Sequence, residues 1–349
     1  MAMTSAEHRF HMPPEWAPHT ATWLSWPHNR ETWPCGLEEA EAALVEGVVA
    51  LAEGERVLIN VRDLVHATQI KELFAGRVEP ERLVLLPIPT NDAWCRDHGA
   101  IIVDDDAGGQ TALDFRYNAW GGKYPPYDLD DAVPEQMAEA LGLSCVSVDM
   151  VLEGGSIDVN GSGTLLTTEE CLLNPNRNPR LGRAHIEAVL GRYLGANQVV
   201  WLGDGIAGDD TDGHVDDLTR FVAADVVVTA VEADPSDVNY APLFDNLQRL
   251  RALRLHDGRP VRTIELPMPE PLYRGSQRLP ATYANFYIGN RVVLAPVFGC
   301  PQDRAAVETL AHCFPDRRIV PIDSRALVVG LGSFHCLTQQ IPAPTRATS

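Results

Sequence analysis

Helix-like and strand-like segments alternate along this chain at a regular spacing. The apolar strand-like segments that follow a helix-like segment begin near residues 83, 146, 199, 261 and 319, so the pattern recurs about every 60 residues. This period is longer than that of a solenoid repeat, and it fits either repeated units of helix, strand, loop and hairpin or an ordinary mixed sheet. No Gly/Ser-rich or charged linker interrupts the pattern. We therefore expect residues 1–349 to form a single α/β domain.

Local patterns indicate which segments form hairpins, helices and strands. Asn160-Gly161 lies between two strand-like runs in 156–167, a strong hairpin signal because both residues tolerate positive φ, and a polar turn at 104–109 divides a second hairpin over 100–115. The spacing of apolar residues predicts helices over 37–51, 64–74, 134–141, 180–194, 238–253 and 301–313. Apolar runs predict strands over 55–61, 82–88, 145–148, 198–202, 261–266 and 318–322.

The chain carries a large excess of acidic side chains. Its 28 lysines and arginines against 48 aspartates and glutamates give a formal net charge of −20. Such a surface repels nucleic-acid phosphates and anionic lipid, which makes both poor partners, and it attracts small cations. The 7 cysteines are odd in number and form no C-x-x-C pair, which favours free thiols. No segment has the length of a membrane span or the apolar core of a signal peptide, so we expect a cytoplasmic protein.

One cysteine follows a loop that contains two glycines. Gly330 and Gly332 precede Cys336 in the run VVGLGSFHCLTQQIP, and glycines let the backbone approach a ligand closely. A nucleophilic thiol needs this access together with positively charged neighbours that lower its pKa, whereas the alternative is a buried structural cysteine. His335 is adjacent, but in an extended segment its side chain would point to the opposite face, which makes it a poor partner for Cys336.

Two further segments carry groups suited to proton transfer. His214 and Asp216 follow a glycine-rich acidic loop over 203–213, and in the strand expected there they share one face. Such a pair can transfer protons and hold a cation; the alternatives are a metal-binding loop and a solvated acidic loop. The spacing fits no EF-hand and no second histidine is near, so we expect no metal site. Glu153 precedes two glycines at the start of a hairpin, where it would lie against a ligand or a histidine, or would simply mark a turn.

Aromatic side chains accompany the remaining candidate acid. Trp94 and Asp97, in the run NDAWCRDHG, combine a flat π-face with a carboxylate, which together suit a planar cation. The alternative is a packed tryptophan beside a surface ion pair of Asp97 with Arg96. Trp120 lies in an aromatic segment with a glycine hinge, RYNAWGGKY, that forms either a lid or a packed loop.

Taken together, these segments resemble the agmatine deiminase family of the guanidine-modifying superfamily, to which bacterial peptidylarginine deiminases of the same branch are closely related. The matching motifs occur in the family's order, which is more specific than any one of them; they lie at 12–16, 23–27, 91–99, 118–123, 153–157, 174–179, 212–216 and 334–342. The resemblance implies a five-bladed α/β propeller of pseudo-symmetric ββαβ units around a central funnel. It also implies a homodimer.

The resemblance further implies a role for each candidate residue. The reaction would convert agmatine and water to N-carbamoylputrescine and ammonia, with no metal or organic cofactor. The implied catalytic set is the nucleophile Cys336, the general acid and base His214, the orienting residue Glu153, and the guanidinium-binding carboxylates Asp97 and Asp216. The implied substrate-binding set is Trp94, Asp97, Trp120, Asp216 and Gly332.

Other substrates and other classes of function are alternatives. Arginine, methylarginine or peptidyl-arginine would each present a carboxylate or a backbone, so an arginine side chain would have to face the funnel; Arg96, Arg116 and Arg177 are the candidates. A non-catalytic propeller that binds a partner, and a thiol amidase on an unrelated fold, are the alternatives of another class. Neither explains why a thiol, an imidazole and several carboxylates occur together in these motifs.

Overall fold

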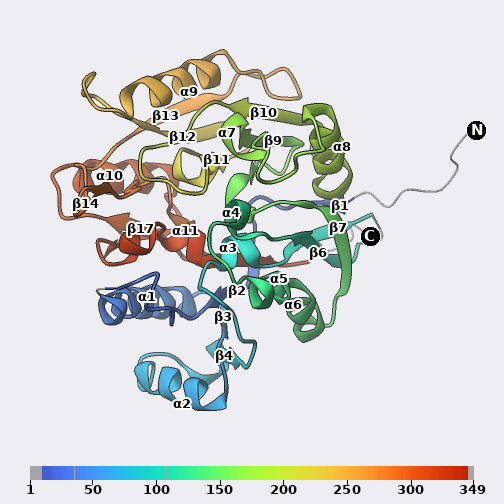
Figure 1. The fold of residues 1–349 in the computed structure, drawn as a ribbon, viewed down its shortest axis with the longest axis vertical. Helices are drawn as coiled ribbons and strands as arrows, with labels where there is room; N and C mark the ends of the chain where they lie inside the picture. Colours follow the sequence, from blue (N-terminus) through green and yellow to red (C-terminus); the bar gives the residue numbers. More distant parts are fainter. Residues whose placement is uncertain (1–9, 35, 107, 345–349) are drawn as a thin grey trace, which may run out of the picture.

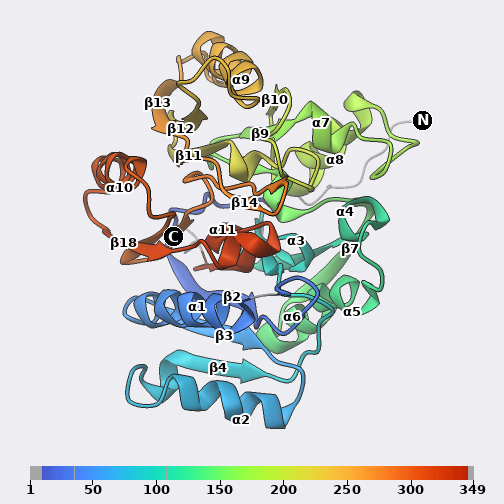
Figure 2. The same ribbon diagram turned by 60° about the vertical axis from the view of Figure 1, so that its left-hand side comes forward.

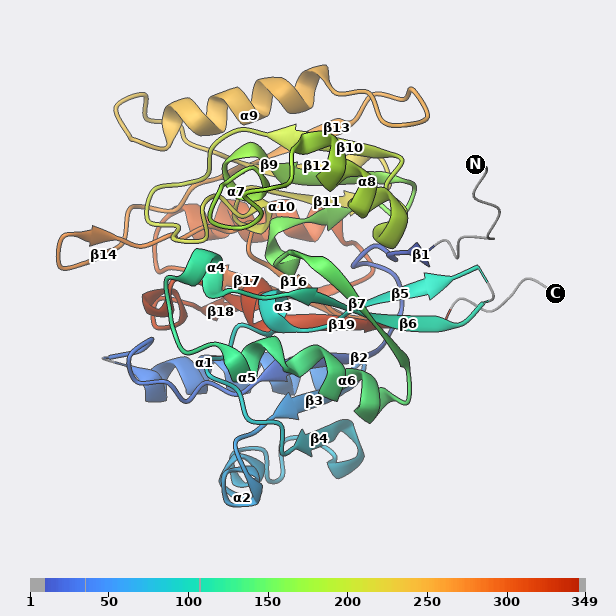
Figure 3. The same ribbon diagram turned by 45° about the vertical axis from the view of Figure 1, so that its right-hand side comes forward.

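The computed structural model describes residues 10–34, 36–106 and 108–344. Its small mixed α/β sheets surround a centre that holds three short helices, α3 (Cys95–His98), α4 (Ala119–Gly122) and α11 (Phe334–Leu337), with the long helices outside (Figure 1). Two of these long helices, α2 and α9, lie at opposite ends of the molecule (Figure 3). No helix in the described ranges is long and apolar enough to cross a membrane.

Within the described chain, five sheets repeat one pattern, in which an antiparallel pair is extended by a parallel strand. A parallel neighbour requires a crossover connection, and here that connection is a helix. One sheet joins the two ends of the chain: it consists of β19 (Thr338–Pro342), β2 (His19–Ser25), β3 (Arg56–Asn60) and β4 (Leu83–Leu86), with crossovers α1 (Leu37–Ala52) and α2 (Leu64–Leu73). Thr338 pairs with Leu24 there, which places the C-terminal strand beside the N-terminal one.

The other four sheets follow in chain order. The next is β1 (Phe10–His11), β5 (Ile101–Asp105), β6 (Gln110–Arg116) and β7 (Ser144–Val151), with α5 (Asp128–Asp131) and α6 (Val133–Leu141). Then come β8 (Asp158–Val159), β9 (Thr164–Thr168) and β10 (Gln198–Leu202), with α7 (Glu169–Leu172) and α8 (Arg183–Leu194). The fourth has β11 (Thr219–Ala223), β12 (Val226–Val231), β13 (Arg262–Pro267) and α9 (Tyr240–Ala252). The fifth has β16 (Tyr287–Ile288), β17 (Val292–Val297), β18 (Arg318–Asp323) and α10 (Gln302–Cys313). A separate hairpin pairs β14 (Tyr273–Arg274) with β15 (Gln277–Arg278).

These elements confirm the predicted helices, strands and hairpins, with ends that differ by a few residues. Two expectations were wrong. The strand expected at 214–216 is a 3₁₀ turn, η3 (Val215–Asp217), and β11 begins only at Thr219. The segment that carries Cys336 is helix α11 and not an extended run, because the strand β19 starts after it.

Short turns of this kind converge at the centre of the molecule. Helix α3 directly precedes β5, η2 (Gly154–Ser156) precedes β8, η3 precedes β11, and α11 precedes β19. Each turn therefore occupies the entry to the first strand of a sheet, and α3 packs against both α11 and η2. Figure 2 shows α3 and α11 side by side between the sheets. The repeat thus brings four distant segments of the sequence to one place.

Close packing fixes α11 in this position. Phe334 is fully buried, and a Cβ atom on Gly47 of α1 would lie 3.0 Å from its Cε1 atom. Because Gly47 has no side chain, the ring of Phe334 fits against α1. Burial of a phenylalanine ring is worth roughly 1.5–3 kcal/mol, which is enough to hold a four-residue helix that could not form alone.

Candidate active site

The thiol of Cys336 lies at the inner end of a cavity. The side chain is 5% exposed and contributes to the lining of a cavity of about 680 Å³, whose wall also includes Trp94, Asp97 and Trp120. Asn285 Nδ2 donates a hydrogen bond to Cys336 Sγ over 3.0 Å, and Sγ lies 3.7 Å from Asp216 Oδ2. The thiol therefore faces polar groups within a mainly apolar enclosure.

Gly332 allows an aromatic wall to form beside this thiol. A Cβ atom at this position would lie 2.5 Å from Trp94 Cζ3 and 3.0 Å from Cys336 Cβ. Any side chain there would displace the indole. The close neighbours of Gly332 are thus the Trp94 ring and Cys336.

Two carboxylates and an imidazole surround a second glycine, Gly155. A Cβ atom on Gly155 would lie 2.7 Å from His214 Nδ1, 2.8 Å from Asp97 Oδ1 and 3.0 Å from Asp216 Oδ2. His214 Nδ1 is 3.7 Å from Asp97 Oδ1, and His214 Nε2 is 4.0 Å from Glu153 Oε2. Glycine is required at 155 because these functional atoms, which come from α3 and from the start of η3, leave no room for a methyl group.

Several polar atoms of this cluster are buried without a hydrogen-bond partner among the described residues. They are Glu153 Oε2, both ring nitrogens of His214, and Asp216 Oδ1. Buried polar groups are normally paired, because an unpaired one costs about 1–3 kcal/mol. A planar cation with several N–H donors would satisfy the carboxylate oxygens together.

Electrostatics in the cluster oppose further negative charge. Burial, together with the charges of Asp216 and Glu153, raises the pKa of Asp97 well above its usual value. Burial and the neighbouring carboxylates likewise raise the pKa of the Cys336 thiol. Burial lowers the pKa of His214 to about 4, although Glu153 and Asp216 favour its protonated form. A bound cation would reverse the first two shifts, because it stabilises a carboxylate and a thiolate.

Trp120 is held over the acids by a strained backbone. Ala119 and Trp120 adopt φ values of 51° and 54°, a left-handed conformation that costs non-glycine residues about 1 kcal/mol or more. Trp120 Nε1 donates to Asp97 Oδ2 over 3.0 Å, and Asn118 caps the turn through Gly121 N. The segment is therefore a packed wall of the cavity, and its indole orients Asp97.

One interaction that the resemblance implies does not form, and neither does the ion pair considered as an alternative for Asp97. Glu153 does not hydrogen-bond His214 directly, since its Oε1 atom accepts from Arg177 Nε at 2.7 Å. Asp97 pairs with Trp120 and the Gly155 amide and not with Arg96. Arg177 compensates the charge of Glu153, which explains how that carboxylate stays fully buried beside two other acids.

The arginines considered as carboxylate receptors are engaged elsewhere. Arg177 is buried against Glu153 and Asp212, and Arg96 is buried and donates to Gln340. Arg116 is exposed and pairs with Asp149. Asn285 was missed altogether, because a lone asparagine has no motif; aligning the repeats would have found it, since it precedes β16 as the other site residues precede their strands.

Two groups of buried side chains in the described residues have donor atoms close enough to hold a metal ion. They are Glu153, Cys171 and His214, and Asp216, Asp217 and Cys336, with donor atoms within 4.8 Å of one another. In the first group Glu153 already pairs with Arg177, and in the second Asp216 accepts from His335 Nδ1 at 2.6 Å. Both groups thus belong to the cluster already described.

Comparisons with known proteins agree with this arrangement. Residues 11–342 match the family model described as Porphyromonas-type peptidyl-arginine deiminase. The agmatine deiminase of Pseudomonas syringae pv. tomato is 40% identical over 361 aligned positions, which cover 97% of each chain. A solved structure of agmatine deiminase from Enterococcus faecalis has a TM-score of 0.88 at 33% identity and covers 96% of both chains. A C. jejuni agmatine deiminase variant with substrate bound also has a TM-score of 0.88 at 33% identity, covering 99% of this chain and 100% of that one.

This chain belongs to the Porphyromonas-type peptidyl-arginine deiminase family.

Proposed function

We propose that this chain is an agmatine deiminase that hydrolyses agmatine to N-carbamoylputrescine and ammonia. The observation that carries the proposal is the convergence of the Cys336 thiol, the His214 imidazole and the carboxylates of Asp97 and Asp216 around Gly155. Relatives at 40% and 39% identity that bear this name support the choice of substrate.

The proposed reaction begins with binding of the guanidinium between Asp97 and Asp216, which keep it protonated and therefore electrophilic. The positive charge lowers the pKa of Cys336, and neutral His214 can accept the thiol proton. The thiolate attacks the guanidinium carbon to give a tetrahedral adduct. His214 then protonates the departing nitrogen, ammonia leaves, and a thiouronium intermediate remains on the sulfur.

The second half of the reaction consumes water. His214 takes a proton from water, which attacks the same carbon, and the thiolate leaves as the ureido product forms. Glu153 supports the protonated state of His214 through its charge, at 4.0 Å, while Arg177 holds the carboxylate in place. Trp94 and Trp120 line the path of the alkyl chain.

The lining of the cavity favours a substrate without a carboxylate. Arg30 and Arg274 also line it, but Arg30 pairs with Glu38, and Arg274 donates to Gln277 and to the carbonyl of Val329. Asp210 lies in the same lining and suits the primary amine at the far end of agmatine. A carboxylate on the substrate would meet this acidic wall.

Ammonia release from a panel of agmatine, arginine, dimethylarginine and a short arginine peptide tests the proposed function. We expect agmatine to have the highest kcat/KM, by at least about tenfold, which corresponds to about 1.4 kcal/mol. A preference for arginine or the peptide would contradict the proposed substrate. Absence of turnover with every member would contradict the proposed chemistry and favour a binding module.

We also propose that the five sheets are the blades of a five-bladed α/β propeller within one domain, residues 1–349. The shared order of an antiparallel pair followed by a parallel strand supports this, as do the entry turns that four of the five sheets contribute to the centre. We propose a cytoplasmic location in addition, which the unpaired cysteines of the described chain support.

We propose, finally, that the protein is a homodimer that forms through α2 and the edge strand β4. Leu64 and Val65 are 73% and 69% exposed, and an apolar cavity of about 650 Å³ adjoins them. Residues 62–82 carry four basic and four acidic side chains, so this segment has no net charge on a chain of −20. A second copy can therefore approach here without the repulsion that opposes contact elsewhere.

Sedimentation velocity tests this surface. Leu64→Glu is expected to convert the dimer to a monomer, because it buries an unpaired charge in the contact. Val238→Glu, a matched change at a residue 64% exposed outside α2 and β4, is expected to leave the dimer unchanged. A monomeric wild-type chain, or a dimer that survives Leu64→Glu, would contradict the proposal.

A further inference from the structure

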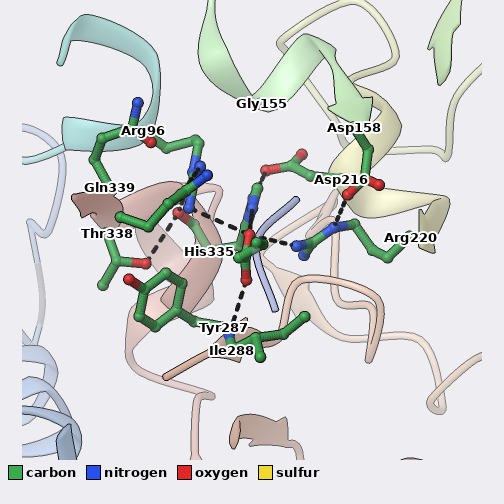
Figure 4. A network of polar contacts seen from close by, with 12 residues as sticks. Arg96, Gly155, Asp158, Asp216, Arg220, Tyr287, Ile288, His335, Thr338 and Gln339 are labelled. Carbon is green, nitrogen blue, oxygen red and sulfur yellow. Dashed lines mark hydrogen bonds and ion pairs between the residues drawn. The ribbon is translucent and has the colours of Figure 1, made fainter. Parts of the chain in front are cut away.

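A buried histidine behind the thiol carries charge that the proposed reaction does not use directly. His335 is 2% exposed and lies between two acids: its Nδ1 atom is 2.6 Å from Asp216 Oδ2, and its Nε2 atom is 2.8 Å from Glu15 Oε2. Figure 4 shows its ring at the centre of the polar network, with Arg96 on one side and Arg220 on the other. The segment is helical and not extended, and the ring of His335 contacts Asp216 and Glu15.

The partners of Glu15 determine the protonation of this ring at Nε2. Glu15 Oε2 also accepts from Arg220 Nη2 at 2.7 Å, and Glu15 Oε1 accepts from the Ile288 amide at 2.8 Å. A carboxylate that accepts from a guanidinium and an amide has no reason to carry a proton, and the Arg220 and His335 charges lower its pKa despite burial. His335 Nε2 must therefore be the donor to Glu15.

Charge balance determines the state of the other nitrogen. The buried network contains the carboxylates of Glu15, Asp158 and Asp216 and the guanidinium groups of Arg96 and Arg220. These groups alone leave one uncompensated negative charge in an interior where that is costly. An imidazolium at His335, donating through Nδ1 to Asp216, neutralises the network.

We propose that His335 is a positioning residue, held as an imidazolium between Glu15 and Asp216, that keeps Asp216 ionised and directs its free oxygen toward the guanidinium. The inference rests on the proposed function. Because His335 engages Oδ2, Asp216 is left with Oδ1, which has no partner among the described residues. Among the described residues Asp97 pairs with no arginine or lysine, and burial lowers the pKa of His214, the imidazole 3.7 Å from it. The two acids therefore differ: His335 lowers the pKa of Asp216 against the effect of burial, whereas that of Asp97 is raised.

Nuclear magnetic resonance of the full chain labelled with ¹⁵N-histidine tests the protonation directly, without reference to turnover. We expect both ring nitrogens of His335 to carry protons at neutral pH, because each faces a carboxylate oxygen. His335→Asn assigns the signal. An unprotonated ring nitrogen at neutral pH would overturn the inference, whatever the activity of the protein.

The pH dependence of kcat/KM for agmatine tests the consequence for Asp216. Removing the imidazolium of His335 raises the pKa of Asp216. In His335→Asn the acidic limb of the plot of kcat/KM against pH should therefore move upward by about one to three pH units. Glu15→Gln, which changes a residue outside the substrate site, should move it in the same direction. Activity of both variants should recover toward the wild-type value at high pH, where Asp216 is ionised again.

A merely structural role would lower activity equally at every pH and leave the limb in place, and that result would overturn the inference. The other charged groups near the ring, Arg96, Arg220, Asp158 and Asp217, are unchanged in these variants. His312→Asn on the exposed face of α10 is the matched control, and we expect its profile to coincide with that of the wild type. A wild-type chain inactive on agmatine would instead contradict the proposed function, while the resonance experiment still decides the state of His335.

Discussion

Cys336→Ala is expected to abolish ammonia release from agmatine while the variant still binds the substrate. The change removes the sulfur on which the covalent intermediate forms, and deletion of a covalent catalyst costs at least about 10³-fold in kcat. Asp97 and Asp216 remain, so affinity for the guanidinium persists. Steady-state ammonia release and calorimetric titration with agmatine measure the two quantities separately.

This change should leave the fold intact. Asn285 Nδ2 loses the hydrogen bond from one of its two N–H groups to the thiol, and the other N–H group still donates to Asp217 Oδ1 over 3.0 Å. Cys313→Ala, which removes a half-buried thiol from α10, is the matched control and should retain full activity. Turnover above about 1% of the wild-type rate in Cys336→Ala would contradict its assignment as nucleophile.

Asp216→Asn is expected to lower deiminase activity and, at the same time, to make the thiol more reactive. The amide has the same shape but no charge, so the guanidinium loses one of its two carboxylates. Removing one partner of a buried charge pair costs about 2–5 kcal/mol, or about 30- to 5,000-fold in kcat/KM. In the empty site, however, Asp216 adds to burial in raising the pKa of Cys336, so its neutralisation lowers that pKa.

Alkylation by iodoacetamide, which is uncharged, measures the second effect. At a fixed pH below the thiol pKa, Asp216→Asn should react faster than the wild type, because more of its thiol is ionised. Asp303→Asn, a matched change at a partly buried carboxylate that accepts from Tyr283, should alter neither rate. Parallel loss of turnover and alkylation in Asp216→Asn would indicate a collapsed site and contradict the proposed role.

Much of the chemistry could be predicted from the sequence, because short motifs carry it. The thiol of Cys336, the imidazole of His214 and the acids Asp97, Asp216 and Glu153 each lie in a glycine-bounded run, and the structure brings them together in one buried cluster. The alternation of helices and strands, which recurs about every 60 residues, could also be predicted. The spacing of apolar residues along the chain indicates which positions are buried in a helix or in a strand.

The side-chain contacts at the centre of the molecule could not be predicted, because they join segments that are far apart in the chain. Asn285 lies beside Cys336 only because the entry to β16 meets α11, and Arg177 reaches Glu153 instead of a substrate carboxylate. The local geometry of the turns was missed for a similar reason: packing of Phe334 against α1, not propensity, makes 334–337 helical.

The sequence alone determined which reactive groups this protein has and which short motifs carry them. Only the tertiary structure decided their charge states and orientations. His335 illustrates the difference: its neighbours in the chain say nothing of Glu15, 320 positions away, yet the hydrogen bond between them sets how Asp216 faces the cavity. Electrostatic energy depends on distance in space and on burial, and both are properties of the folded chain.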